Sequence, residues 1–168
     1  MVDVKYPIVD DADNIIGQSS KDEAYQQGLQ LRSIQIFLFD SAGKLFVQKR
    51  ANQKKRFPSY FCASVAGHVE PGENYLTAAK RELKEELGIK EPIKFLSAGK
   101  TPIGDNQFAM MAHFTAQTSA QIKLQADEID DGQFYTLNEI QNLIDGGGLF
   151  TPSFLYSFNK MKKDNHEV

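Results

Sequence analysis

The stretch GHVEPGENYLTAAKRELKEELGI, residues 67–89, decides how this chain is expected to fold. Residues 74–87 within it contain no glycine or proline and consist largely of alanine, leucine, glutamate, lysine and arginine, the strongest helix formers. Gly88 follows as a helix C-cap, and residues 67–72 hold two glycines and a proline, a composition typical of a loop. The stretch therefore predicts a loop, a helix and a second loop.

The predicted helix has an apolar face and, beside it, a row of carboxylates. The apolar positions recur at spacings of three and four and are Leu76, Ala79, Leu83 and Leu87. Glu82, Glu85 and Glu86 lie about 110–120° around the helix from that face. Like charges this close repel each other, and Mg²⁺, which prefers oxygen ligands, would relieve the repulsion. An ordinary charged helix face fits the same spacing, so the row alone leaves both interpretations open.

The remaining chain shows short apolar strands and two closing helices. The clearest hairpin joins residues 33–39 to 44–49, and a weaker pattern predicts another hairpin over residues 6–17. Further apolar runs or strands are expected at 60–65, 93–95, 107–115 and 133–136, and helices at 137–144 and 151–161. An aromatic stripe at i, i+4 and i+8 along the last helix, expected in the core, consists of Phe150, Phe154 and Phe158.

Length and composition exclude several classes of protein. With 168 residues, 41% hydrophobic and 24% charged, a single globular domain (1–168) is expected, with an N-terminal extension (1–30) and a polar tail (160–168). A net charge of −3 predicts no affinity for nucleic acid polymers or anionic lipid. The longest apolar run, 36–39, is far below the ~20 residues of a membrane helix. A single cysteine, Cys62, and an N-terminus unlike a signal peptide favour a reducing, cytoplasmic setting.

A spaced set of residues within the opening stretch points to a family. In order, it reads Gly67, Glu73, Arg81-Glu82-Leu83, Glu85-Glu86 and Gly88-Ile89. This pattern resembles the Nudix box without a departure. The resemblance implies an α+β fold, an α/β/α sandwich with a mixed β-sheet and a loop-helix-loop catalytic motif. It also implies a metal-dependent hydrolase that cleaves a diphosphate linkage by attack of water on phosphorus, with Mg²⁺ as cofactor and Mn²⁺ as an alternative.

The resemblance assigns roles to particular residues. Glu73 would pair with Arg81 to fix the loop on the helix, and Gly67 would let the backbone turn tightly. The implied metal ligands are Glu82, Glu85, Glu86, the backbone carbonyl of Ala66, and a downstream glutamate, Glu128. These residues together would form the catalytic and metal-binding set.

Two assignments in this set stay open. Glu128 lies in an acidic loop just before a predicted strand, where Asp127 and Asp131 compete with it and where a merely solvated loop is an equal alternative. A carboxylate would serve as general base, and either Glu82 or Glu128 fits that role.

Basic residues supply candidates for substrate binding. Residues 49–56 hold five basic side chains in eight, so Lys49 or Arg50 could meet a phosphate, although a solvated strand end and loop is the simpler interpretation. His68 lies inside the box loop, where it could touch metal or substrate, although a loop histidine without a role is the simpler interpretation. The expected partner is a small-molecule diphosphate, either a nucleoside diphosphate linked to another group or a related organic diphosphate. No membrane partner is expected, and a homodimer stays open.

Two alternative functions are compatible with parts of the sequence. Lys49-Arg50, Phe57-Pro58 and Ala66-Gly67-His68 resemble the Nudix branch that includes isopentenyl diphosphate isomerase. That enzyme needs a cysteine immediately before the Gly-His pair and two N-terminal histidines, and these positions here are Ala66, Tyr25 and Leu31. A non-catalytic nucleotide-sensing domain would be expected to lose box carboxylates, and none is lost. The hydrolase is therefore the preferred prediction.

Overall fold

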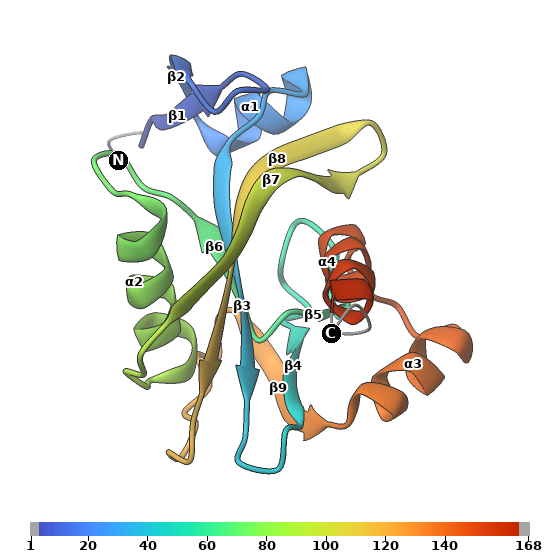
Figure 1. Cartoon of the computed structure of the whole chain (residues 1–168). Helices are drawn as coiled ribbons and strands as arrows, with labels where there is room; N and C mark the ends of the chain where they lie inside the picture. The colour runs from blue at the N-terminus through green and yellow to red at the C-terminus, as the bar shows by residue number, and fades with distance from the viewer. Residues whose placement is uncertain (1–3, 165–168) are drawn as a thin grey trace.

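Strand β3 (Arg32–Phe39) lies at the centre of a computed structural model that describes residues 4–164 (Figure 1). Its three neighbours are β4 (Leu45–Arg50) and β6 (Val65–His68), both antiparallel, and β8 (Gln107–Gln117), which is parallel. The sheet is completed by β5 (Phe61–Cys62) and β9 (Ile129–Tyr135), which pair with β4, and by β7 (Lys94–Gly104), which pairs with β8. The predicted mixed sheet is confirmed.

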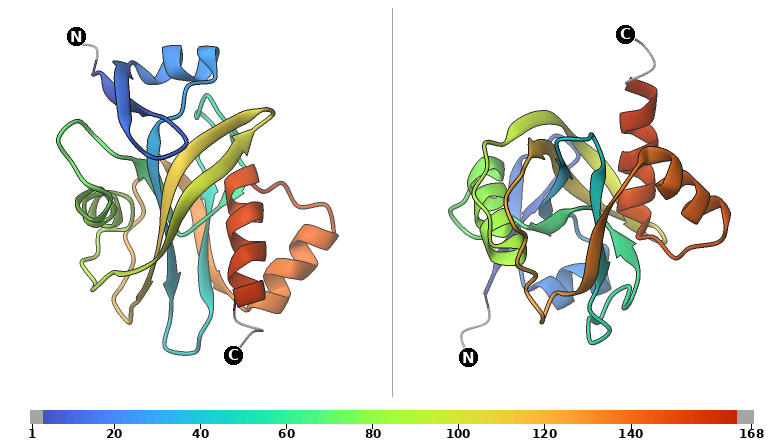
Figure 2. Two further views of the ribbon diagram at one scale, coloured as in Figure 1. Left: turned by 45° about the horizontal axis from the view of Figure 1, so that its top comes forward. Right: turned by 90° about the horizontal axis from the view of Figure 1, so that it is seen from below.

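Helices cover both faces of this sheet (Figure 2). They are α2 (Tyr75–Leu87) on one face, and α3 (Leu137–Asp145) and α4 (Pro152–Asp164) on the other. Alternation along β3 explains the two layers, because successive strand side chains point to opposite faces. Ile34 and Ile36 pack in the core under α2, whereas Phe37 packs with the aromatic residues of α4. The expected α/β/α sandwich is confirmed.

The aromatic stripe lies in the core, as expected, although Phe150 precedes α4 and forms a β-bridge with Phe61. Phe154 and Phe158 are fully buried, and Phe150 is only 4% exposed. The ring centroids of Phe150 and Phe154 lie 5.3 Å apart, and those of Phe154 and Phe158 lie 5.4 Å apart, both pairs stacked. The stripe therefore attaches α4 to the sheet.

A smaller N-terminal unit sits at one end of the main sheet (Figure 1). It contains the expected hairpin, β1 (Tyr6–Val9) and β2 (Ile15–Ser19), and a helix that was not predicted, α1 (Lys21–Gln27). Ser20 caps α1 by accepting a hydrogen bond from the Glu23 amide, and Gly28 ends the helix in the left-handed conformation. The unit has its own small core of Tyr6, Ile8, Ala24 and Leu31.

Several sequence predictions need correction. Leu76 is 42% exposed, because Tyr75 packs against the core in the first turn of α2 instead. Residues 160–164 continue α4 and are not a tail, while 165–168 lie outside the described residues. Strand β7 is much longer than residues 93–95, since pairing with β8 offsets the weak strand propensity of its glycines and proline. No helix within residues 4–164 is long and apolar enough to cross a membrane.

Phe154→Ala should lower the free energy of unfolding by about 3–5 kcal/mol, because it removes a fully buried ring stacked between two others. Urea denaturation followed by circular dichroism measures this loss. Activity per folded molecule should survive. A melting temperature within about two degrees of wild type, with a much higher KM, would instead place the ring in the substrate pocket.

Candidate active site

The box helix is fixed at both ends by its own sequence. Asn74 precedes α2, and its side-chain oxygen accepts a hydrogen bond from the Thr77 amide at 2.9 Å. Gly88 ends the helix with a φ of 69°, a conformation that glycine adopts without strain. The carboxylates of the helix are therefore presented from a rigid element at the edge of a cavity.

Arg81 is the hub of the loop-helix contact. Its guanidinium donates to both carboxylate oxygens of Glu73, at 2.8 and 2.9 Å, and to the backbone carbonyl of His68 at 2.9 Å. It also donates to Glu82 at 2.8 Å and to Glu85 at 3.1 Å. The hydrogen bond from Arg81 lowers the pKa of Glu73, so this pair remains charged. The geometry expected of Glu73 and Arg81 is thus present.

Gly67 has a different role from the one expected. It lies within β6, and the left-handed turn of the loop falls at Gly72, with a φ of 84°. A Cβ atom added at Gly67 would lie 2.1 Å from Oε1 of Glu82, closer than any real contact. The Glu82 side chain lies directly against the Gly67 backbone, so a larger residue here would displace that carboxylate. Strand β6 also extends further than composition predicted.

Glu86 is the most buried carboxylate of the site. It is only 5% exposed, and Gln48 on β4 donates a hydrogen bond to it at 2.8 Å. Burial, reinforced by repulsion from Glu82 and Glu128, raises the pKa of Glu86 to about 8. Burial also raises the pKa of Glu82, and Arg81 opposes that shift. These buried carboxylates therefore gain from a cation that would compensate their charge.

Glu128 reaches the same cavity from the segment just before β9. Its carboxylate forms an ion pair with Lys54 at 2.5 Å, and its carbonyl accepts a hydrogen bond from the Ala51 amide at 2.9 Å. Asp127 also lines the cavity. By contrast, Asp131 lies opposite Lys49 in the register of strands β9 and β4, and neither residue lines the cavity.

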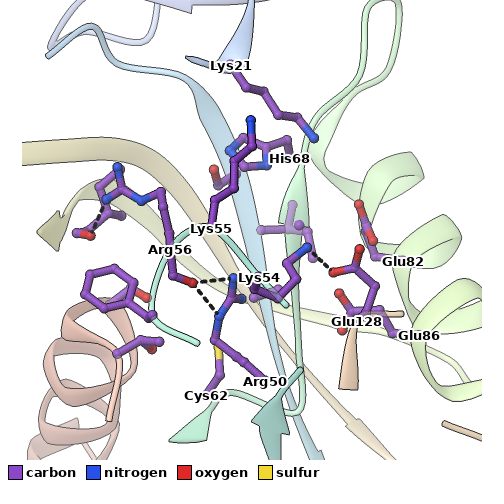
Figure 3. Close-up of a pocket in the computed structure, with 18 of the residues that line it drawn as sticks. Lys21, Arg50, Lys54, Lys55, Arg56, Cys62, His68, Glu82, Glu86 and Glu128 are labelled. Carbon is purple, nitrogen blue, oxygen red and sulfur yellow. Dashed lines mark hydrogen bonds and ion pairs between the residues drawn. The ribbon is translucent and has the colours of Figure 1, made fainter. Parts of the chain in front are cut away.

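The cavity has a volume of about 910 Å³, and its wall opposite α2 is basic (Figure 3). The cationic residues on that side are Lys21, Arg50, Lys54, Lys55 and Arg56. His68 also lines the cavity, and Tyr25 Oη lies 2.6 Å from His68 Nε2. Burial, together with the surrounding cations, lowers the pKa of His68 to about 3, so its ring is neutral at physiological pH.

The sequence prediction missed several residues of this cavity. Lys21 and Tyr25 reach it from α1, Arg56 from the loop after β4, and Gln48 supports Glu86 from beneath. The signals for α1 were its Ser20 N-cap and its Gly28 C-cap, which are visible in the sequence. Nothing local distinguished Gln48 or Arg56 from their neighbours, since their roles depend on tertiary contacts.

The donor set of the cavity fits a hard divalent cation. Within residues 4–164 no three His, Cys, Asp or Glu side chains are already gathered into a metal cluster. Each carboxylate instead has a protein partner: Arg81 for Glu82, Gln48 for Glu86, and Lys54 for Glu128. The candidate metal ligands in these three glutamates are all carboxylate oxygen atoms. Ala66, whose backbone carbonyl was an expected ligand, also lines the cavity. Oxygen-rich, mutually repelling ligands are those that Mg²⁺ prefers.

The mixed sheet between helices and the glutamate-bearing loop-helix at its edge define an α/β/α class of protein, and comparison with known proteins identifies its family. The NUDIX domain model matches residues 29–154. An uncharacterised Nudix hydrolase of Yersinia pestis is 34% identical over 161 residues, spanning 95% of this chain and 86% of that protein. The chain belongs to the Nudix family and is a hydrolase acting on phosphoanhydrides.

Two further comparisons concern the isomerase-like branch of the family and the fold. An isopentenyl-diphosphate Delta-isomerase 2 of Photorhabdus laumondii is 31% identical over 141 residues, spanning 82% of this chain and 80% of that protein. The crystal structure of DR0079 from Deinococcus radiodurans matches with a TM-score of 0.82 at 23% identity, covering 93% of this chain and 98% of that one. The second likeness supports the fold alone.

Gly67→Ala should leave the fold intact but displace Glu82, because the new methyl group can only be accommodated by moving that side chain. We expect activity to fall on the order of 100-fold, as expected for a catalytic group moved by about 1 Å. Steady-state kinetics and thermal melting measure both effects. Gly99→Ala is the matched control, since no atom lies within 4 Å of its added Cβ. Equal activity of the two variants would contradict the role given to Gly67.

The metal-free protein should lose stability as pH rises, through the raised pKa of Glu86. The folded protein retains the Glu86 proton up to pH about 8, whereas the unfolded chain loses it near pH 4.5. The contribution of Glu86 to the free energy of unfolding is therefore complete below pH about 4.5 and is lost as the pH approaches about 8. Chemical denaturation in chelator at several pH values measures the slope. Glu86→Gln should flatten it, and an unchanged slope would contradict the burial argument.

Proposed function

We propose that this chain hydrolyses a diphosphate linkage in a nucleoside diphosphate linked to another group, or in a related organic diphosphate, with Mg²⁺ or Mn²⁺ as cofactor. The observation that carries the proposal is the buried Glu86 carboxylate, which lies beside Glu82 and Glu128 in one cavity with a basic opposite wall. Such a site pairs ligands for a divalent cation with a guanidinium, that of Arg50, for a phosphate.

The ligands proposed for the metal are Glu82, Glu85, Glu86, Glu128 and the Ala66 carbonyl. Bound there, the metal would neutralise phosphate charge and make water a better nucleophile. Arg81 and Glu73 do not touch the phosphate in this account. They hold the loop and the first glutamates of the helix in place through the hydrogen bonds that Arg81 donates.

The chain's own residues would move the proton and hold the charge. Glu82 or Glu128 would accept the proton of the attacking water, and both carboxylates border the cavity. Arg50 lines the cavity with its guanidinium held by the Arg56 carbonyl, at 3.1 and 3.2 Å, so it is positioned to bind a phosphate oxygen. His68, being neutral, would donate or accept a hydrogen bond and carry no charge.

Isomerase chemistry is the second candidate, favoured by the relative that carries that name. The structure offers little for it. Leu31 is buried in the small apolar core, and Tyr25 is hydrogen-bonded to His68. Burial raises the pKa of Cys62, so its thiol is not activated, and Ala66 occupies the position of the isomerase cysteine. Hydrolysis is therefore the better-supported function.

Glu82→Gln and Glu86→Gln should each reduce kcat by at least about 100-fold, which corresponds to about 2.7 kcal/mol of transition-state stabilisation. Each amide keeps the shape of the side chain but loses the charge proposed to bind metal. Hydrolysis of a panel of diphosphates with Mg²⁺ and Mn²⁺ provides the measurement. Asp145→Asn, on the distant α3, should retain full activity. Retention of more than about a tenth of the activity by either glutamate variant would refute the assignment.

A further inference from the structure

Arg56 is a cation of the cavity for which the proposed reaction has no use. It lies in the loop between β4 and β5, on the wall opposite the glutamates of α2 (Figure 3). Its guanidinium donates to Gln107 Oε1 at 2.7 Å and to the Ile103 carbonyl at 2.9 Å. It also lies 4.1 Å from the ring centroid of Tyr25. These contacts fix its position firmly.

Every one of these partners is neutral. Among residues 4–164, no carboxylate oxygen lies within 4.0 Å of a nitrogen of the Arg56 guanidinium. Two other cations of the same cavity differ, because Lys54 pairs with Glu128 and Lys55 pairs with Asp22. The positive charge of Arg56 is thus held in place on the cavity wall without a counter-charge from residues 4–164.

Arg50 adds to this uncompensated charge. In the described part of the chain it too has no carboxylate partner, and its guanidinium donates to the backbone carbonyl of Arg56. Partly buried cations are ordinarily paired, because an uncompensated charge away from bulk water is costly. The Arg56 guanidinium, anchored by neutral acceptors in the cavity wall, is preorganised to bind a phosphate or carboxylate.

We propose that Arg56 binds a second anionic group of the substrate, a phosphate or carboxylate on the part of the molecule beyond the diphosphate that is cleaved. This inference rests on the proposed function, which places the cleaved diphosphate beside Glu82 and Glu86. The opposite wall then faces the group attached to the diphosphate. Substrates with a charged distal group are preferred over neutral ones for this reason, and Arg56 determines that specificity.

Matched pairs of diphosphates that differ only in one distal charge provide the test. UDP-glucuronate and UDP-glucose differ by a carboxylate, while NADP and NAD, and coenzyme A and dephospho-coenzyme A, each differ by a phosphate. The carboxylate and phosphate pairs distinguish the two sources of charge. In at least one pair, kcat/KM should be at least about fivefold higher for the charged member, the range expected for one charge-assisted contact.

Arg56→Gln should remove that preference and leave kcat/KM for the neutral member within about threefold of wild type. Arg56→Lys should restore part of the preference, because it keeps the charge, whereas a purely structural role would not be rescued by charge. Lys90→Gln, an exposed cation outside the cavity, is the control and should change neither value. Thermal melting verifies that each variant folds.

Equilibrium binding keeps this inference separate from the proposed function. Calorimetric titration of the same pairs in chelator should show tighter binding of a charged member to wild type than to Arg56→Gln. If no diphosphate is hydrolysed with Mg²⁺ yet this binding difference persists, the proposed function fails and the subsite stands. Loss of affinity or kcat/KM for neutral and charged members alike would place Arg56 on the cleaved diphosphate. That result, or equal binding of both members of every pair, would overturn the inference.

Discussion

The hydrogen bonds of one guanidinium hold together the edge of this protein that carries the buried carboxylates. Arg81 donates to Glu73 in the loop, to the His68 carbonyl at the end of β6, and to Glu82 and Glu85 on its own helix. The loop, the strand and the helix are thereby joined at a single point. Without that cation, neighbouring glutamates on one helix face would repel each other and the loop would lose its anchor. Because Arg81 donates hydrogen bonds to Glu73, Glu82 and Glu85, these three carboxylates can lie close together.

The rest of the site follows from the space around that hub. Gly67 leaves room for the Glu82 side chain, and Gln48 supports Glu86 where burial raises its pKa. The acidic wall that results faces a basic wall contributed by α1 and by the loop after β4 (Figure 3). The N-terminal residues before position 29 lie outside the family match, yet Lys21 and Tyr25 line the cavity. The box thus supplies the acidic wall of the cavity, and segments outside the family match contribute to its basic wall.

Features that depend on residues close together in the chain could be predicted from the sequence, whereas features that depend on residues far apart in the chain could not. The box helix, the main hairpin and the buried stripe of α4 were predicted because periodicity and capping are local. The Glu73–Arg81 pairing was expected from the resemblance to the Nudix box. Gln48 and Arg56 were missed because their partners lie far along the chain, and Lys49 was expected in the cavity although it alternates away from Arg50 across β4. Leu76 was predicted to be buried because it follows the apolar spacing of the helix, yet its side chain is exposed. The spacing of apolar residues does not indicate how far along the helix the core extends.

In the proposed reaction, water attacks phosphorus in a diphosphate held between the acidic and basic walls. Hydrolysis in ¹⁸O-labelled water, followed by mass spectrometry of the products, tests this step. We expect the label to enter one phosphate-containing product, and removal of divalent metal by chelator to stop the reaction until Mg²⁺ or Mn²⁺ is returned. The proposed reaction would be contradicted if no diphosphate were cleaved while isopentenyl diphosphate acquired deuterium from heavy water, because that result would mean proton transfer at carbon.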